Sequence, residues 1–427
     1  MSMPVDASHR HVEPGRSGSA PDGPRSWQGT TLRRQNYSAV LRTILIDGPI
    51  SRVDIARRVG LTPTAITSIV TSLLAAGLVM EVQPPNPGRD RGRPKVPVDI
   101  DPGALSVLGL FIGGTHTSVG LIDLSGHLIA ETDVEQVGTS ATELIEDIAT
   151  AARRLMDTAS PAGPILGVGA SIGGWVDTER GVVLDHVRPH WVGTPLRSRL
   201  EERIGLPVVL NSNARAMALL ESWLGAAKGV RNFIYVSIGA LVASALFIDG
   251  KVYDGARSAS GSIDHLSVRV RTATRCFCGR RDCLHVAVSD EAVLRLAYEA
   301  GVPTSIASVR ELAETAAAGD LAAARVLRNR ARHTGNAVGQ LADLLNPELI
   351  LLGGSILDAP EYLDDVRRQA AASSHAAPGV ADLIRPSVFG HRALSRASGA
   401  LVLNQYYADP LAYSPLARDA RVRGAVQ

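Results

Sequence analysis

Three cysteines and a histidine have the spacing that points most directly to chemistry. All the cysteines of the chain, Cys276, Cys278 and Cys283, fall within one short segment, and His265 precedes them. One imidazole and three thiolates make a closed tetrahedral set that suits structural Zn²⁺ and leaves no position for a catalytic water. Such clustering favours a metal site in a reducing compartment over a disulfide framework. The alternative is three free thiols in a turn.

Short polar side chains near the N-terminus form a second candidate site. Residues 50–82 predict two helices joined by a turn at 59–61, with Ser51 and Thr62 as N-caps. The pattern is typical of a helix-turn-helix, whose second helix enters the major groove of DNA. The alternative is a helical hairpin packed on a larger domain. The residues expected to reach bases or phosphates are Arg52, Thr62, Thr64, Ala65, Thr67, Ser68 and Thr71.

A basic, turn-rich segment follows these helices. It would form a two-stranded wing that brings Arg89, Arg91 and Arg93 to the phosphates or the minor groove. Although the net charge is only +2, residues 1–97 hold 13 Arg and Lys against 7 Asp and Glu. A basic N-terminal part on a mildly acidic body is expected of an attached nucleic-acid-binding module. A solvated basic tail is the alternative.

These residues must be positioned by the domains of the chain. A chain of 427 residues is too long for one ordinary core, so we expect two or three domains. Beyond the wing, apolar strand-like runs alternate with helical segments, which indicates an α/β architecture. Two similar β-rich openings, near 105–130 and 233–253, fit a duplicated, two-lobed fold. The expected divisions are a disordered tail 1–34, a winged helix-turn-helix 35–97, a first lobe 98–225, a second lobe with the cysteine cluster 226–405, and a C-terminal tail 406–427.

Neither a run of 18 apolar residues nor an apolar N-terminal segment is present. We therefore expect a cytoplasmic protein without a membrane partner.

Residues 36–404 resemble the ROK family (repressors, open reading frames, kinases). GPISRVDIARRVGLTPTAITSIVTSLLAAGLVMEV, followed by Gly92-Arg93-Pro94, is similar to the winged helix-turn-helix of ROK repressors. The segment CFCGRRDCLH is similar to the zinc motif of the family. The resemblance implies a winged helix-turn-helix joined to a two-lobed, actin-like (ribonuclease H-like) sugar-kinase fold. It also implies Zn²⁺ on His265 and the three cysteines, operator DNA as partner, and a homodimer or homotetramer.

The catalytic residues of ROK kinases are changed in this chain. Sugar phosphorylation needs a carboxylate base and glycine-rich turns that hold the ATP phosphates. Phe111 replaces the acid of the first turn, and the second turn keeps only Gly239. The base position holds Asn213, or Ser212 in an alternative register. Losing a general base alone costs about 10² to 10⁴ in rate, so we expect no enzyme activity.

The sugar-binding acids of the family are replaced as well. Ser262 and His285 stand where the family has glutamates, so the short charge-assisted bonds to sugar hydroxyls are lost. We expect the cleft to bind a different molecule, such as an anion, or none. The resemblance also implies that the metal-bound ring of His265 faces the ligand. The candidate effector residues are Gly174, Arg188, His190, Ser212, Asn213, Ser262, His265 and His285.

The leading hypothesis is a DNA-binding transcriptional regulator, a repressor, with an inactive sugar-kinase-like domain for oligomerisation and small-molecule sensing. One alternative is an active ATP-dependent sugar kinase that carries a DNA-binding arm. Another is a ligand-independent protein that binds DNA and docks partners.

Overall fold

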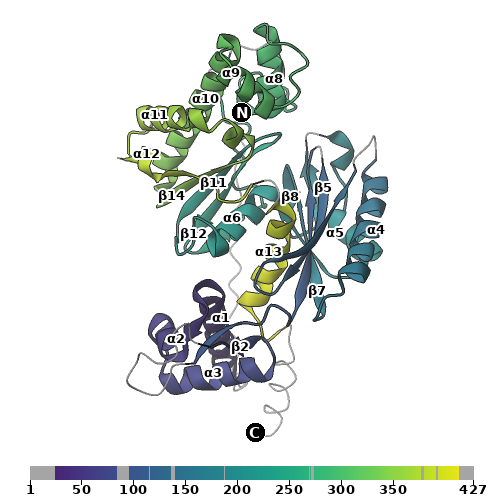
Figure 1. Ribbon diagram of the computed structural model, residues 1–427, viewed down its shortest axis with the longest axis vertical. Coiled ribbons are helices and arrows are strands. Elements are labelled where there is room, and N and C mark those ends of the chain that lie inside the picture. Colours follow the sequence, from purple (N-terminus) through teal and green to yellow (C-terminus); the bar gives the residue numbers. More distant parts are fainter. Residues whose placement is uncertain are drawn as a thin grey trace, which may run out of the picture.

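The computed structural model describes residues 25–83, 96–114, 116–135, 140–186, 188–268, 270, 274–376, 379–390 and 393–412. Figure 1 shows a small helical domain beneath two α/β lobes. No helix among these residues is long and apolar enough to span a membrane. The expected wing arginines, Arg89, Arg91 and Arg93, lie outside the described residues.

The small domain has the expected helix-turn-helix. Its elements are α1 (Arg25–Asp47), β1 (Ile50–Ser51), α2 (Arg52–Val59), α3 (Pro63–Ala75), β2 (Val79–Glu81) and β3 (Pro97–Ile100). Ser51 caps α2 by accepting a hydrogen bond from the backbone of Asp54, and Thr62 caps α3 by accepting one from Ala65. Both caps confirm the sequence prediction. Strand β3 pairs antiparallel with β1 and β2, which places it in the centre of a small sheet.

The two lobes repeat one sheet topology. The first sheet has the order β10-β7-β4-β5-β6, and the second has the order β13-β12-β11-β14-β15. In each, three consecutive strands form an antiparallel meander, and two later strands add in parallel on the other side. The duplication inferred from the sequence is confirmed.

The strands of the first sheet are β4 (Ser106–Ile112), β5 (Thr117–Asp123), β6 (Leu128–Val134), β7 (Ile165–Ile172) and β10 (Val208–Ser212). Those of the second are β11 (Phe233–Ile238), β12 (Val242–Ile248), β13 (Lys251–Tyr253), β14 (Leu349–Gly353) and β15 (Ile384–Pro386). A two-stranded hairpin of β8 (Trp175–Asp177) and β9 (Val182–Asp185) extends from the first lobe.

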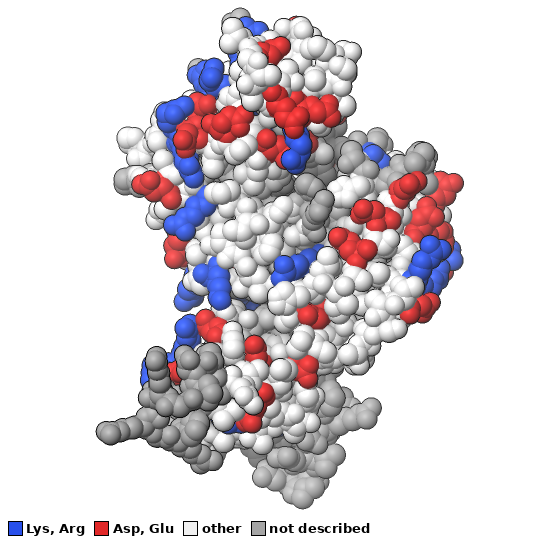
Figure 2. Space-filling model, viewed as in Figure 1, with Lys and Arg blue, Asp and Glu red and all other residues white. Residues whose placement is uncertain are grey.

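Helices cover the outer faces of both sheets, and two further helices lie between the lobes. The outer helices are α4 (Ala141–Ala159) and α5 (Leu196–Ile204) on the first lobe, and α7 (His285–Val288), α8 (Asp290–Glu299), α9 (Val309–Ala317), α10 (Leu321–Leu345), α11 (Leu363–Ser373) and α12 (Val380–Leu383) on the second. The helices α6 (Asn213–Leu224) and α13 (Leu394–Ala408) share one core with strands of both sheets. On the face in Figure 2, acidic side chains gather over the outer helices of both lobes.

Helix α13 approaches the first sheet so closely that two strand glycines are required. Gly109 of β4 and Gly169 of β7 are paired across neighbouring strands. A Cβ at Gly109 would lie 1.9 Å from the carbonyl oxygen of Ser395, and one at Gly169 would lie 1.8 Å from that of Ser398. A glycine within a strand often marks such a close backbone approach.

The small N-terminal domain docks directly on these inner helices. Arg42 of α1 donates to the side-chain oxygen of Asn404 at 2.9 Å and to its backbone oxygen at 3.2 Å. Its guanidinium lies 5.9 Å from the ring centre of Trp223, at the end of α6. Burial lowers the pKa of Arg42. A single hydrophobic core continues from α1 into α6 and α13.

Elements of the structure run across three of the expected divisions. Helix α1 begins at Arg25, so the last ten residues of the expected disordered tail are helical. Strand β3 runs across the boundary at 97, because its pairing with β1 and β2 holds residues to Ile100 in the small domain. Helix α13, assigned to the second lobe, packs on the first sheet. It continues to Ala408 because Tyr406 and Tyr407, assigned to the tail, are buried in the core.

Replacing Gly169 by alanine should destabilise the protein. The added methyl group must displace backbone of α13, and overpacking of this kind costs about 1–3 kcal/mol. Urea unfolding, with the variant Gly103→Ala as control, measures the loss, since a Cβ at Gly103 meets nothing closer than 3.4 Å. Equal stability of the two variants would show that α13 is not tightly packed.

Candidate functional site

The exposed face of α3 carries short uncharged side chains. Thr64, Thr67, Ser68 and Thr71 are exposed, and Ala65 is half-buried. The opposite face packs into the core of the domain through Ile66, Ile69, Val70 and Leu73. Part of this polar face is used within the helix, because the hydroxyl of Thr67 donates to the carbonyl of Pro63 at 2.8 Å. Hydroxyl groups at these positions can hydrogen-bond base edges, and methyl groups can contact the methyl groups of thymine.

Two of the residues expected to bind DNA already have partners in the protein. A terminal nitrogen of Arg52 lies 2.9 Å from a carboxylate oxygen of Glu81 in β2. This ion pair, whose side chains are 31% and 47% exposed, joins α2 to β2. The hydroxyl of Thr62 accepts the capping bond of α3. Both residues therefore have structural roles in the domain.

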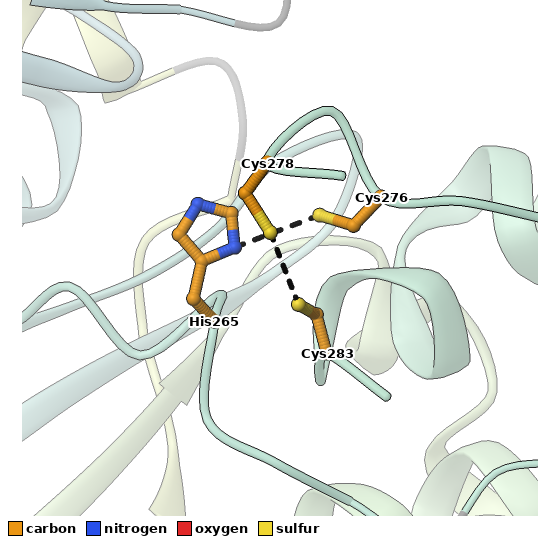
Figure 3. A group of neighbouring side chains, drawn as sticks. All are labelled: His265, Cys276, Cys278 and Cys283. Atoms are coloured by element: carbon orange, nitrogen blue, oxygen red, sulfur yellow. Dashed lines mark hydrogen bonds between the residues drawn. The ribbon is translucent and has the colours of Figure 1, made fainter. Parts of the chain in front are cut away.

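The four expected metal ligands lie together, as Figure 3 shows. Their donor atoms all lie within 4.8 Å of one another. The Nδ1 atom of His265 is 3.5 Å from the sulfur of Cys276, and the sulfurs of Cys278 and Cys283 are 3.4 Å apart. The thiols are free and form no disulfide. A nitrogen and three sulfurs at this spacing can hold one metal ion.

A tight backbone turn brings the cysteines to this point. The amide of Gly279 donates to the carbonyl of Cys276 at 2.8 Å, and the amide of Cys276 donates to the carbonyl of Arg280 at 2.7 Å. Gly279 has a φ of 90°, which a residue with a side chain rarely adopts. Burial raises the pKa of the Cys276 thiol to about 12. Binding of a metal ion must therefore displace a firmly held proton from it.

The second ring nitrogen of His265 has a partner within the protein. Its Nε2 atom lies 3.2 Å from the carboxylate of Asp264, whose side chain is 19% exposed. Burial raises the pKa of Asp264, and the nearby His265 opposes this shift. His285 packs its ring edge-on against Phe277, with ring centres 5.3 Å apart. Burial lowers the pKa of His285, which favours its neutral form.

The position of the kinase base lies at the N-terminus of α6. The side-chain nitrogen of Asn213 is 3.5 Å from the carbonyl oxygen of Ile112. Its side-chain oxygen is buried without a partner among the described residues. Ser212, the N-cap residue, makes no side-chain capping bond. Leu241, from the turn between β11 and β12, covers Gly173, where a Cβ would lie 1.9 Å from its methyl group. This side chain thus occupies the space beside Gly173, next to Asn213.

The remaining effector candidates come from the turn between β7 and β8, from the loop after β9 and from the second lobe. Gly174 has a φ of 81° and faces the carbonyl of Asp185. Arg188 donates a hydrogen bond to the carbonyl of Gly114, in the first glycine turn. His190 is exposed and packs against Trp191. Ser262 is exposed, and its hydroxyl donates to the carbonyl of Ala259 at 3.1 Å.

A buried arginine that the sequence analysis missed ties the two lobes together. Arg215 of α6 donates to the carbonyls of Ser258 at 2.8 Å and Ser260 at 3.0 Å. It also forms an ion pair with Asp254 at 3.2 Å. Across the same loop, the hydroxyl oxygens of Thr178 and Ser258 are 2.7 Å apart. An arginine within a mostly apolar helix was the available signal, since a buried guanidinium needs several acceptors.

Known proteins share both parts of the chain. The ROK family pattern matches residues 107–405, and a winged helix-turn-helix DNA-binding pattern matches residues 38–80. A transcriptional regulator of Mycobacterium tuberculosis is 33% identical over 388 residues, which cover 88% of this chain and 86% of that protein. The DNA-binding transcriptional repressor Mlc of Escherichia coli is 30% identical over 363 residues, which cover 81% and 88%.

Solved structures agree with this assignment. A ROK family transcriptional regulator, described as a homologue of E. coli Mlc, matches with a TM-score of 0.74 and 25% identity over 88% of this chain and 97% of its own. The ROK hexokinase of Thermus thermophilus matches with a TM-score of 0.57 and 29% identity, over 69% of this chain and 97% of its own. The hexokinase match thus covers less of this chain than the regulator match does. The chain belongs to the ROK family and has the two-domain organisation of its DNA-binding transcriptional regulators.

Proposed function

We propose that this protein is a repressor that binds operator DNA through α3 and does not phosphorylate sugars. The observation that carries the proposal is the exposed face of α3, with its hydroxyl and methyl groups, on a domain that docks firmly on a kinase-like body. Since α3 has no charged side chain, ion pairs with phosphates must come from other segments. We assign them to Arg89, Arg91 and Arg93 of the expected wing.

A single α3 covers only a few base pairs, so specific binding needs two copies. We propose that the large domain holds the chain as a homodimer or homotetramer. Two recognition helices would then meet major grooves that are one helical turn apart, or a multiple of it.

Two features of the chain support the proposed lack of kinase activity. Asn213 cannot take a proton from a sugar hydroxyl, because an amide is not a base at neutral pH. The glycine turns that hold the ATP phosphates are changed as well, because Phe111 replaces the acid of the first turn and the second keeps only Gly239. Restoring the carboxylate alone would therefore not restore phosphoryl transfer.

We propose that the cleft binds a small effector which is not a standard sugar. Arg188 lies beside the first glycine turn, where its guanidinium can bind an anion. The buried oxygen of Asn213 can accept a further hydrogen bond from the ligand. A ligand that shifts the lobes would move α6 and α13, on which Arg42 holds the DNA-binding domain.

We propose that the metal of the cysteine cluster is Zn²⁺. Three thiols and one imidazole are the donor set of structural zinc sites, and no place remains for a reacting water. The ion would fix the loop 265–283 that borders the effector candidates Ser262 and His285.

Substituting Ser68 by alanine should weaken specific DNA binding and leave the fold intact. Loss of one contact to a base costs about 1 kcal/mol, or about a fivefold change in Kd. Fluorescence anisotropy with a DNA fragment selected by the wild-type protein measures the affinity. Thr158→Ala is the control, because Thr158 is an exposed hydroxyl on the distant helix α4. Equal affinities of the two variants would argue against α3 as the reading helix.

Neither the wild type nor Asn213→Asp should consume ATP in the presence of hexoses. The restored carboxylate would supply a base, but the second glycine turn, which keeps only Gly239, would still lack the glycines that hold the ATP phosphates. A coupled assay for ADP over a panel of hexoses is the measurement. Sugar-dependent ADP formation by the wild type, abolished in Asn213→Ala, would show an active kinase instead.

A further inference from the structure

We propose that Asp264 is a positioning residue for the metal centre, which keeps the proton of His265 on Nε2 and presents Nδ1 to the metal. The inference rests on the proposed zinc site. Its basis is the position of the imidazole between two groups. Nδ1 points to the sulfur of Cys276 at 3.5 Å, and Nε2 points to the carboxylate of Asp264 at 3.2 Å.

The chemistry of the ring makes this position important. A neutral imidazole has one N–H and one lone pair, and only the nitrogen with the lone pair can bind a metal. A carboxylate beside Nε2 accepts its N–H, so the lone pair belongs to Nδ1. The same contact makes Nδ1 more basic and thus a stronger ligand. Without the carboxylate, part of the population would have the proton on Nδ1, where it competes with the metal.

The surroundings hold both partners in place. The backbone amide of His285 donates to the carbonyl of Asp264 at 2.9 Å. The ring of His265 packs against Phe277, with centres 4.8 Å apart, and Arg280 donates to the backbone carbonyl of His265. With the backbone fixed and one ring face covered, the imidazole has little freedom to turn. The carboxylate therefore selects the protonation state of a ring that is already oriented.

This contact also changes the expected role of His265 toward an effector. The resemblance implied that the metal-bound ring of His265 faces the ligand. In this chain Nε2, the ring nitrogen that is not assigned to the metal, already has Asp264 as its partner. An effector can reach it only by displacing the carboxylate, so Asp264 separates the metal centre from the ligand in the cleft.

The test compares zinc affinity in three full-length proteins by competition with a chromophoric chelator. Asp264→Ala should bind zinc about 10- to 100-fold more weakly than the wild type, as expected for loss of a carboxylate behind a ligating histidine. The matched control is Asp282→Asn. Asp282 lies in the same loop and is 48% exposed, and its carboxylate accepts from Ser267 and pairs with Arg280. Its substitution should change the affinity less than about threefold, since it does not contact a ligand.

A second measurement determines directly which ring nitrogen of His265 carries the proton. Nitrogen-15 NMR of the imidazoles in metal-free protein should show His265 protonated at Nε2 in the wild type and as a mixture of tautomers in Asp264→Ala. A merely structural role of Asp264 would not move this signal.

The outcomes separate the inference from the proposed zinc site. If the wild type retains no zinc, the metal centre itself is wrong, and with it the role of Asp264. If the wild type binds one zinc ion and Asp264→Ala binds it equally well, only the role of Asp264 is overturned. Equal weakening by Asp264→Ala and Asp282→Asn would also overturn it, because general attraction by negative charge would then explain both.

Discussion

The close packing of α13 on the first sheet is the contact on which the arrangement of the domains depends. Gly109 and Gly169 let the backbone of the helix lie directly on two neighbouring strands. The other sides of α13 contact α6 and the DNA-binding domain, through the pair of Trp223 with Tyr407 and the bond from Arg42 to Asn404. One helix, formed by the end of the chain, thus joins the two lobes and the N-terminal domain into a single core (Figure 1).

This arrangement connects the position of the kinase base to the DNA-binding domain. Helix α6 begins at Asn213 and ends beside Arg42 of that domain. Its twelve residues span about 18 Å, at 1.5 Å per residue. Near its start, Arg215 ties it to a loop of the second lobe. The helix that carries Asn213 in this kinase-like fold therefore also holds the DNA-binding domain.

The sequence predicted local features well and long-range ones poorly. The caps at Ser51 and Thr62, the repeated meander and the metal cluster depend on neighbouring residues or a short motif, and the structure has all of them. The docking of α13 depends on contacts across most of the chain, so the burial of Tyr406 and Tyr407 was missed. Gly109 and Gly169 indicated a close approach of backbone, but a glycine alone does not identify the segment that packs against it.

The candidate sites show the same contrast between local features, which the sequence predicted, and long-range contacts, which it did not. Short exposed residues on α3 were placed correctly because helix periodicity determines which face is buried. The partners of single side chains were not predictable, since Arg52 with Glu81 and Asp264 with His265 depend on exact rotamers in the folded protein. The covering of Gly173 by Leu241 likewise follows only from the way the lobes meet.

Genome-wide footprinting of the purified protein tests the central claim, a DNA-reading domain on a kinase-like body, most directly. We expect a limited set of protected sites that share a two-fold repeat, with half-site centres one or more helical turns apart. Such sites should remain protected against excess non-specific DNA. Protection that is sequence-independent and lost with moderate salt would contradict the claim, because it would show phosphate attraction alone.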